Sequence, residues 1–254
     1  MVPIRKPFQG VANIVRFNWH FYVLSIGVVV LILMFNRYLP SPYQFYTTLL
    51  CILAIVTTLV SLLVSVYVYD LSGLYNLDWL NGTGMKSNGT SVNINAGFDE
   101  TSSLLRAKYP AVNLLVYDFY NAEKHTEISI ERARKAYPPY PGTTAITTGS
   151  LPLPDSSVDN VIVILAAHEI RDDAERVLFF KELNRVLKPS GKIIVTEHLR
   201  DLPNFLAYNI GFFHFLSKSS WLTTFENAGL QIVDELKLTP FISTLILEKN
   251  EAAH

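Results

Sequence analysis

Two stretches in the second half of the chain decide the fold: TGSLPLPDSSVDNVIVILAAHEI (148–170) and ELNRVLKPSGKIIVTEHLRD (182–201). Within the first, Asn160–Leu165 is a continuous aliphatic run, typical of a strand buried on both faces. Asp172–Leu187 then carries apolar residues at a helical period. The turn sequence KPSG ends this helix, and Lys192–Glu197 predicts the next strand. Together they predict a strand–helix–strand unit of a parallel sheet.

The same alternation continues on both sides of this unit. Further strands are expected at 91–96, 113–118, 143–147, 231–236 and 243–248, and further helices at 100–108, 126–137 and 217–228. Alternating strands and helices predict an α/β fold with a doubly wound, mostly parallel, seven-stranded Rossmann-like sheet. Ligands of such sheets bind at the carboxyl ends of the strands.

The first eighty residues have a different composition, with four basic and two acidic side chains. Phe45–Tyr69 is 25 residues without a charge, and Phe21–Phe35 is a shorter uncharged run flanked by Trp19 and Tyr38. A bilayer core needs about 20 apolar residues in a helix. We therefore expect two transmembrane α-helices, at about 19–39 and 45–69, that form a hairpin. A cleaved signal peptide fits poorly because a second span follows directly, and a buried helical pair in a soluble protein is the remaining alternative.

Basic residues predict the orientation of this hairpin. Arg5, Lys6 and Arg16 precede the first span, whereas only Arg37 lies between the spans. The positive-inside rule then places both termini and the catalytic domain in the cytoplasm, as in a bacterial inner-membrane protein. The expected domains are the membrane hairpin (1–70), a flexible linker rich in Gly and Asn (71–90) and the soluble domain (91–254).

Charge and cysteine content exclude some classes. The formal net charge of −1 gives no electrostatic footprint for nucleic acid. A single cysteine, Cys51, excludes an internal disulfide and a cysteine-based zinc site. The oligomeric state is left open.

Three short elements within 148–201 resemble the class I S-adenosylmethionine-dependent methyltransferases, and are closest to the ubiquinone/menaquinone-biosynthesis methyltransferases. SLPLPD (150–155), SVD (157–159) and RVLKPSG (185–191) correspond to the elements acidic-x-x-Leu-Pro-Phe-Pro-Asp, Ser-Phe-Asp and Arg-Val-Leu-Lys-Pro-Gly-Gly of that branch. The resemblance covers about residues 91–248. It implies S-adenosylmethionine as the cofactor and methyl transfer as the reaction.

The resemblance also implies where the adenine lies. It places Thr148, Gly149, Ser150 and Leu151 beside the adenine ring, with Ala166 after the fourth strand. The acidic residue of this element in the family is replaced here by Gly149 or Ser150.

The loop after the first strand has one glycine, where a nucleotide-binding loop normally has several. Its residues look like the Ala-Gly-x-Asp-Thr loop of the leucine carboxyl methyltransferases: Asn95, Ala96, Gly97, Phe98, Asp99 and Glu100. Gly97 would allow close approach of the cofactor, and Asp99 or Glu100 would hold its methionine ammonium. The alternative is a strand-to-helix turn in which Glu100 favours a helix N-terminus.

Asp118 ends the second strand, 21 residues beyond Gly97, and Phe119 follows it. A carboxylate at this spacing can accept both ribose hydroxyls. The same spacing would suit NAD, but the glycine triplet of NAD-binding loops is missing.

Histidines are the candidate general bases for removing a proton from the methyl acceptor. His168 follows the fourth strand and is the first choice, and His198 follows the fifth strand and is the second. His125, His168, His198 and His214 all lie in the soluble domain, but their spacing fits no compact motif. We therefore expect no metal, with a metal site as the alternative.

The segment 204–221 is rich in aromatic residues that could line a lipophilic pocket or touch a bilayer. Combined with the hairpin, it predicts an integral-membrane S-adenosylmethionine-dependent methyltransferase that acts on a lipophilic small molecule such as a lipid, quinone or pigment. The alternatives are a catalytically inactive, membrane-tethered binding module and, more weakly supported, a nicotinamide-dependent oxidoreductase.

Overall fold

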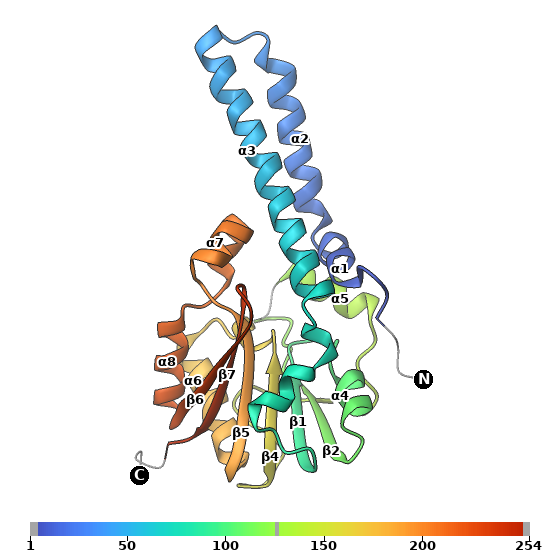
Figure 1. Cartoon of the computed structure of the whole chain (residues 1–254), viewed down its shortest axis with the longest axis vertical. Helices are drawn as coiled ribbons and strands as arrows, with labels where there is room; N and C mark the ends of the chain where they lie inside the picture. Colours follow the sequence, from blue (N-terminus) through green and yellow to red (C-terminus); the bar gives the residue numbers. More distant parts are fainter. Residues whose placement is uncertain (1–4, 125–126, 251–254) are drawn as a thin grey trace.

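The computed structural model describes residues 5–124 and 127–250 and contains one seven-stranded sheet in the order β3-β2-β1-β4-β5-β7-β6 (Figure 1). β1 to β5 run parallel, while β7 is antiparallel to both β5 and β6. The predicted doubly wound, mostly parallel fold is therefore confirmed. The strands are β1 (Gly89–Asn95), β2 (Val112–Asp118), β3 (Thr144–Ala145), β4 (Val158–Ile164), β5 (Leu187–His198), β6 (Leu230–Thr239) and β7 (Ile242–Lys249).

Helices cover both faces of the sheet because the central strands are apolar on both faces. Val161 and Val163 of β4 belong to the core that α6 (Asp173–Val186) and α8 (Lys218–Asn227) complete. Ile162, between them, points to the opposite face, where α4 (Ser102–Lys108) packs. Another helix, α5 (Ile128–Ala136), lies between β2 and β3 in the chain. This alternation explains the continuous apolar run in the sequence.

The predicted KPSG turn has a different form in the structure. β5 already begins at Leu187, which pairs with Val158, and the next pair joins Lys192 to Asn160. Four residues of β5 thus lie opposite one residue of β4, so the turn is a bulge within the strand.

Two long helices project from the sheet domain as an antiparallel pair (Figure 1): α2 (Trp19–Asn36) and α3 (Ser41–Val66). Within the described residues 19–36 no side chain is buried. Both helices are long and apolar enough to cross a membrane, by length and composition. The pair lies outside the core, so the alternative of a helical pair buried in a soluble protein does not fit.

The stretch expected to be a flexible linker instead packs against the sheet domain. α3 continues into a π-helix, η1 (Tyr67–Leu71), and two 3₁₀-helices follow, η2 (Leu74–Asn76) and η3 (Asp78–Thr83). Leu77 and Leu80 are buried against Leu105 and Ile162. The expectation of flexibility is wrong, because these leucines bury apolar surface that a free tether would expose. The domain bounds themselves stay a prediction.

Candidate active site

A cavity of about 280 Å³ lies at the carboxyl ends of β1, β4 and β5, where a doubly wound sheet binds its ligands. We call it the strand-end cavity. Ile94, Asn95, Ile164 and His198 line it from the strand ends. Its other lining residues come from the N-terminal segment, from η1 and η2, from α5, and from the loops and short helices that follow the strands: Gly10, Asn13, Ile14, Phe17, Asn18, Tyr69, Tyr75, Phe98, Glu100, Thr101, Ser129, Ile130, Ala133, Leu165, His168, Glu169, His214 and Phe215.

A short helix that the sequence analysis missed covers part of this cavity: α1 (Gln9–Phe17). The Asp70 carboxylate fixes its first turn by accepting hydrogen bonds from the Gly10 and Val11 amides (2.7 and 3.0 Å). A Cβ on Gly10 would lie 2.5 Å from Tyr69 Cβ, so only glycine permits this approach. The available signal was the helical spacing of the buried residues Gly10, Asn13 and Phe17.

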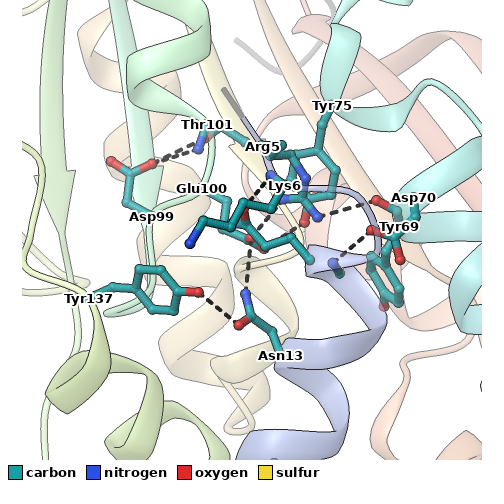
Figure 2. Close-up of polar contacts among 12 residues, drawn as sticks. Arg5, Lys6, Asn13, Tyr69, Asp70, Tyr75, Asp99, Glu100, Thr101 and Tyr137 are labelled. Atoms are coloured by element: carbon teal, nitrogen blue, oxygen red, sulfur yellow. Dashed lines mark hydrogen bonds and ion pairs between the residues drawn. The ribbon is translucent and has the colours of Figure 1, made fainter. Parts of the chain in front are cut away.

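Glu100 points into the cavity and is held from several sides (Figure 2). Its carboxylate accepts hydrogen bonds from Arg5 Nη1 (2.7 Å), the Tyr75 hydroxyl (2.8 Å) and Asn13 Nδ2 (3.5 Å). Asp99 points away from it, and its Oδ1 accepts from the backbone amide of Thr101 at 2.9 Å, at the start of α4. Of the two acids proposed for the cofactor ammonium, Glu100 is therefore the one that lines the cavity.

Gly97 and Asp118 lie at adjacent strand ends, as expected, because Asn95 pairs with Asp118 in the parallel ladder. Gly97 has φ +98°, a conformation that other residues rarely adopt. Arg134 lies between the two: it forms an ion pair with Asp118, and a Cβ on Gly97 would lie 2.8 Å from Arg134 Nη1. An arginine of α5 thus occupies the position expected for the ribose.

The other predicted cofactor-binding residues lie mostly outside the cavity lining. Asn95 lines it, and its Oδ1 accepts from the Gly97 amide (3.0 Å). Phe98 also lines it, in edge contact with Phe17 of α1. Among the described residues, these others are absent from the lining: Ala96, Gly97, Asp99, Asp118, Phe119, Thr148, Gly149, Ser150, Leu151 and Ala166.

Several members of that set have structural partners instead. Phe119, Leu151 and Ala166 are part of the hydrophobic core. The Thr148 hydroxyl donates to Glu175 Oε1 (2.5 Å) and the Leu151 amide donates to Glu182 Oε2 (3.1 Å), both acceptors being on α6. Their contact with adenine stays a prediction.

His168 is enclosed by two carboxylates. Its Nδ1 lies 2.7 Å from Glu197 Oε2, and its Nε2 lies 3.1 Å from Glu169 Oε1. Burial disfavours the charged ring, but Glu197 and Glu169 outweigh burial and raise the pKa of His168 to about 10. In this arrangement the protonated ring has no lone pair for a general base.

His198 has the opposite character. Burial lowers its pKa to about 4, so the ring is neutral at physiological pH. Its Nδ1 contacts Asn204 Oδ1 (3.0 Å), which requires Nδ1 to donate, and its Nε2 accepts from the Tyr69 hydroxyl (2.8 Å). The sequence analysis missed Tyr69, which it counted as the end of a membrane span.

A second cavity of about 660 Å³ adjoins the first at the base of the helical hairpin. We call it the hairpin cavity. Hydroxyl groups of α2 and α3 line it, together with η5 (Asn209–His214). The two cavities share Ile14, Asn18, Tyr69, Ser129, His214 and Phe215.

The sheet order, the antiparallel β7 and the strand-end cavity define a Rossmann-like α/β domain of the methyltransferase fold. Residues 87–195 match the model of the family described as "Methyltransferase domain". No curated protein matches the sequence.

Solved structures share this fold. An S-adenosylmethionine-dependent methyltransferase from Aquifex aeolicus is 16% identical, with a TM-score of 0.50 over 70% of this chain and 90% of that one. A protein from Pyrococcus horikoshii OT3 is 19% identical, with a TM-score of 0.51 over 70% and 90%. Geranyl diphosphate C-methyltransferase from Streptomyces coelicolor A3(2) is 11% identical, with a TM-score of 0.50 over 70% and 79%. Residues 87–195 therefore carry a methyltransferase domain, and the solved structures show that it has the fold of S-adenosylmethionine-dependent methyltransferases.

The residues at the strand ends fit this cofactor chemically. Glu100 and Asp118 are carboxylates, groups that can accept from an ammonium or from a pair of hydroxyls, while Arg134 lies in the space beside Gly97. Both carboxylates are bound by arginines in this structure. The Arg134 side chain is 37% exposed and also lies over the Tyr120 ring.

Proposed function

We propose that this chain is a membrane-anchored methyltransferase that transfers a methyl group from S-adenosylmethionine to a lipophilic small molecule. One observation supports this most strongly: the strand-end cavity adjoins a second cavity at the base of an apolar helical hairpin. An acceptor dissolved in the bilayer would reach the first cavity through the second. The resemblance to quinone-biosynthesis methyltransferases gives the narrower expectation of a quinone-like acceptor.

In this proposal Asp118 binds the ribose hydroxyls and Glu100 binds the methionine ammonium, after Arg134 and Arg5 have turned aside. The cofactor, when bound, supplies an already activated methyl group. The task of the protein is then to align the acceptor with that group.

Tyr69 and His198 are the groups we propose for removing the acceptor proton. Tyr69 lines both cavities, and its hydroxyl donates to the neutral His198 ring. A proton of the acceptor passes to the Tyr69 oxygen while Tyr69 gives its own proton to His198 Nε2. His198, the second choice from the sequence, thus becomes the preferred base.

The proposed membrane anchor consists of α2, α3 and the segment after β5. At 1.5 Å per residue α2 is about 27 Å long, close to the thickness of a bilayer core. α7 (Leu202–Tyr208) lies beside α3 in Figure 1, and α7 and η5 expose Leu206 (62%), Ile210 (84%) and Phe213 (64%). Such exposed apolar groups suit an interfacial position. We propose that both termini and the catalytic domain lie in the cytoplasm.

The two bound arginines also favour a second candidate function, a catalytically inactive, membrane-tethered binding module. In that case Arg5 and Arg134 would hold the carboxylates permanently and exclude the cofactor. Incubation with a trideuterated methyl donor separates the two candidates.

The experiment uses the purified full chain, membrane lipid extract and donor, with products read by mass spectrometry. We expect a lipid-soluble product that carries a CD₃ group in place of one hydrogen of the acceptor. Tyr69→Phe should lower its formation at least about 100-fold, since general-base catalysis contributes about that much. Tyr67→Phe, two residues away and exposed, is the matched control. A folded wild-type chain that neither binds the donor nor labels the extract would contradict the proposal and favour the inactive module.

A further inference from the structure

Three side chains at the junction of the two cavities point toward one position. Glu169 Oε1 lies 3.1 Å from His168 Nε2 and 3.4 Å from His214 Nε2, and one ligand atom from each residue lies within 4.8 Å of the others. We propose that His168, Glu169 and His214 bind a divalent transition-metal ion. Neither the fold nor the proposed methyl transfer requires such a site.

The distances suit a shared ion. Nitrogen and oxygen ligands of zinc lie about 2.1 Å from the ion, so two ligands of a tetrahedral site are about 3.4 Å apart. The separations of Glu169 Oε1 from the two imidazole nitrogens, 3.1 and 3.4 Å, are close to this value. Two imidazoles and one carboxylate are also a donor set that transition metals favour, and they leave coordination positions open.

The second nitrogen of each imidazole already has a carboxylate partner. His168 Nδ1 lies 2.7 Å from Glu197 Oε2, and His214 Nδ1 lies 3.1 Å from Glu127 Oε1. Metal-bound histidines almost always donate their other N–H in this way, which fixes the ring orientation. Each ring therefore presents Nε2 toward Glu169.

Both rings have a carboxylate at each nitrogen. A neutral imidazole that binds an ion through Nε2 keeps one N–H, which it donates from Nδ1. With an ion in place, His168 would donate to Glu197 and His214 would donate to Glu127.

One cation must move for the ion to bind. Arg171 Nη2 contacts both ring nitrogens of His214, Nε2 at 2.9 Å and Nδ1 more closely, and Arg171 Nη1 donates to the His214 carbonyl oxygen. The Arg171 side chain is 40% exposed and lies 3.8 Å from Glu127 Oε1, so the proposal requires it to leave the His214 ring for solvent or for Glu127.

The location indicates what the ion would do. His214 lines both cavities, Glu169 lines the strand-end cavity and Glu127 lines the hairpin cavity. If the proposed function holds, the open positions would receive an oxygen of the acceptor and orient it, a role that metal ions perform for hydroxyl and phosphoryl groups. This role rests on the proposed function, whereas ion binding does not.

Zinc titration of the untagged, chelator-treated full chain in detergent tests the site directly. We expect one Zn²⁺ per chain by calorimetry, and visible absorption bands when Co²⁺ is used instead. His214→Ala should weaken Zn²⁺ binding at least about 100-fold, and Glu127→Gln, which removes the group behind that ring, about 10–100-fold. His20→Ala, which lies outside the cluster, should leave Zn²⁺ binding unchanged.

Two results would overturn the inference. The first is no stoichiometric binding of Zn²⁺ or Co²⁺ by the wild type. The second is Zn²⁺ binding by His214→Ala and by Glu127→Gln that is as tight as that of the wild type. Near-ultraviolet circular dichroism of each variant checks that it has folded. S-adenosylmethionine binding, measured in the same samples, distinguishes failure of the metal site from failure of the proposed function, because either can occur without the other.

Discussion

The carboxylates at the strand ends are each held by an arginine from a separate part of the chain. Arg5 precedes α1 and binds Glu100, while Arg134 belongs to α5 and binds Asp118. In the proposed function these arginines compete with the cofactor for the same oxygen atoms. Their removal should therefore reveal whether the carboxylates serve a ligand.

Arg134→Met should tighten the binding of S-adenosylmethionine. The variant keeps an apolar stem but frees Asp118. A partly exposed ion pair contributes about 0–1 kcal/mol, so the dissociation constant should fall by up to about fivefold. Calorimetry measures this change, with Lys135→Met, an exposed neighbour, as the control. Weaker binding by Arg134→Met would show that Arg134 is part of the ligand site.

The buried carboxylate of Asp159 should make the stability of the domain depend on pH. It is 6% exposed and accepts hydrogen bonds from Lys86, Lys188 and the Thr90 amide. Burial raises its pKa, but these donors outweigh burial, so the pKa lies below its usual value. A depressed pKa stabilises the fold above the unfolded-state pKa of about 3.9, and this contribution is lost as pH falls through the folded-state pKa.

Asp159→Asn should therefore destabilise the domain by about 1–3 kcal/mol at pH 7, and its difference from wild type should shrink as pH falls below about 4. Thermal unfolding in detergent across this range measures both effects. Asp155→Asn, whose side chain is 77% exposed, should be close to neutral. A difference that persists at low pH would contradict this assignment.

The segment from η1 to η3 joins the helical hairpin firmly to the sheet domain. Leu80 of η3 is fully buried, whereas Leu71 at the end of η1 is 67% exposed. Leu80→Ala should lower stability by about 2–5 kcal/mol because it leaves a cavity. Leu71→Ala should change it by less than about 0.5 kcal/mol. Chemical denaturation distinguishes them, and equal effects would restore the flexible linker expected from the sequence.

The segment formed by α7 and η5 should contact the bilayer at its exposed apolar side chains. A spin label at Ile210→Cys, in a Cys51→Ala background and in liposomes, should be accessible to oxygen and protected from a water-soluble nickel complex. Ile210 is 84% exposed. The control is Val233→Cys, at a position on β6 that is 41% exposed. Equal nickel accessibility at both positions would contradict interfacial contact.

For the whole molecule, the order of strands and helices was predictable because hydrophobic periodicity is a local property of the sequence. The two apolar helices were predictable from hydropathy for the same reason. Gly97 and Asp118 were placed at adjacent strand ends because a parallel ladder with a known strand order fixes that neighbourhood.

The side-chain contacts around the cavity were not predictable, because they join distant parts of the chain. Arg5 and Glu100 are 95 residues apart, and Tyr69 and His198 are 129 residues apart. No local pattern indicates that α1 turns back over the strand ends. The meeting of His168 with His214 has the same origin, which is why spacing along the chain gave no metal motif.

Binding of S-adenosylmethionine at the strand ends, with Asp118 at the end of β2 holding the ribose, underlies every part of the proposed function. Calorimetry of the full chain in detergent tests this most directly. We predict 1:1 binding with a dissociation constant in the range of about 1 μM to 1 mM. The same titration of Asp118→Ala should show binding at least about tenfold weaker. A folded wild type that gives no binding at millimolar S-adenosylmethionine, or an Asp118→Ala variant that binds as tightly as wild type, would contradict it.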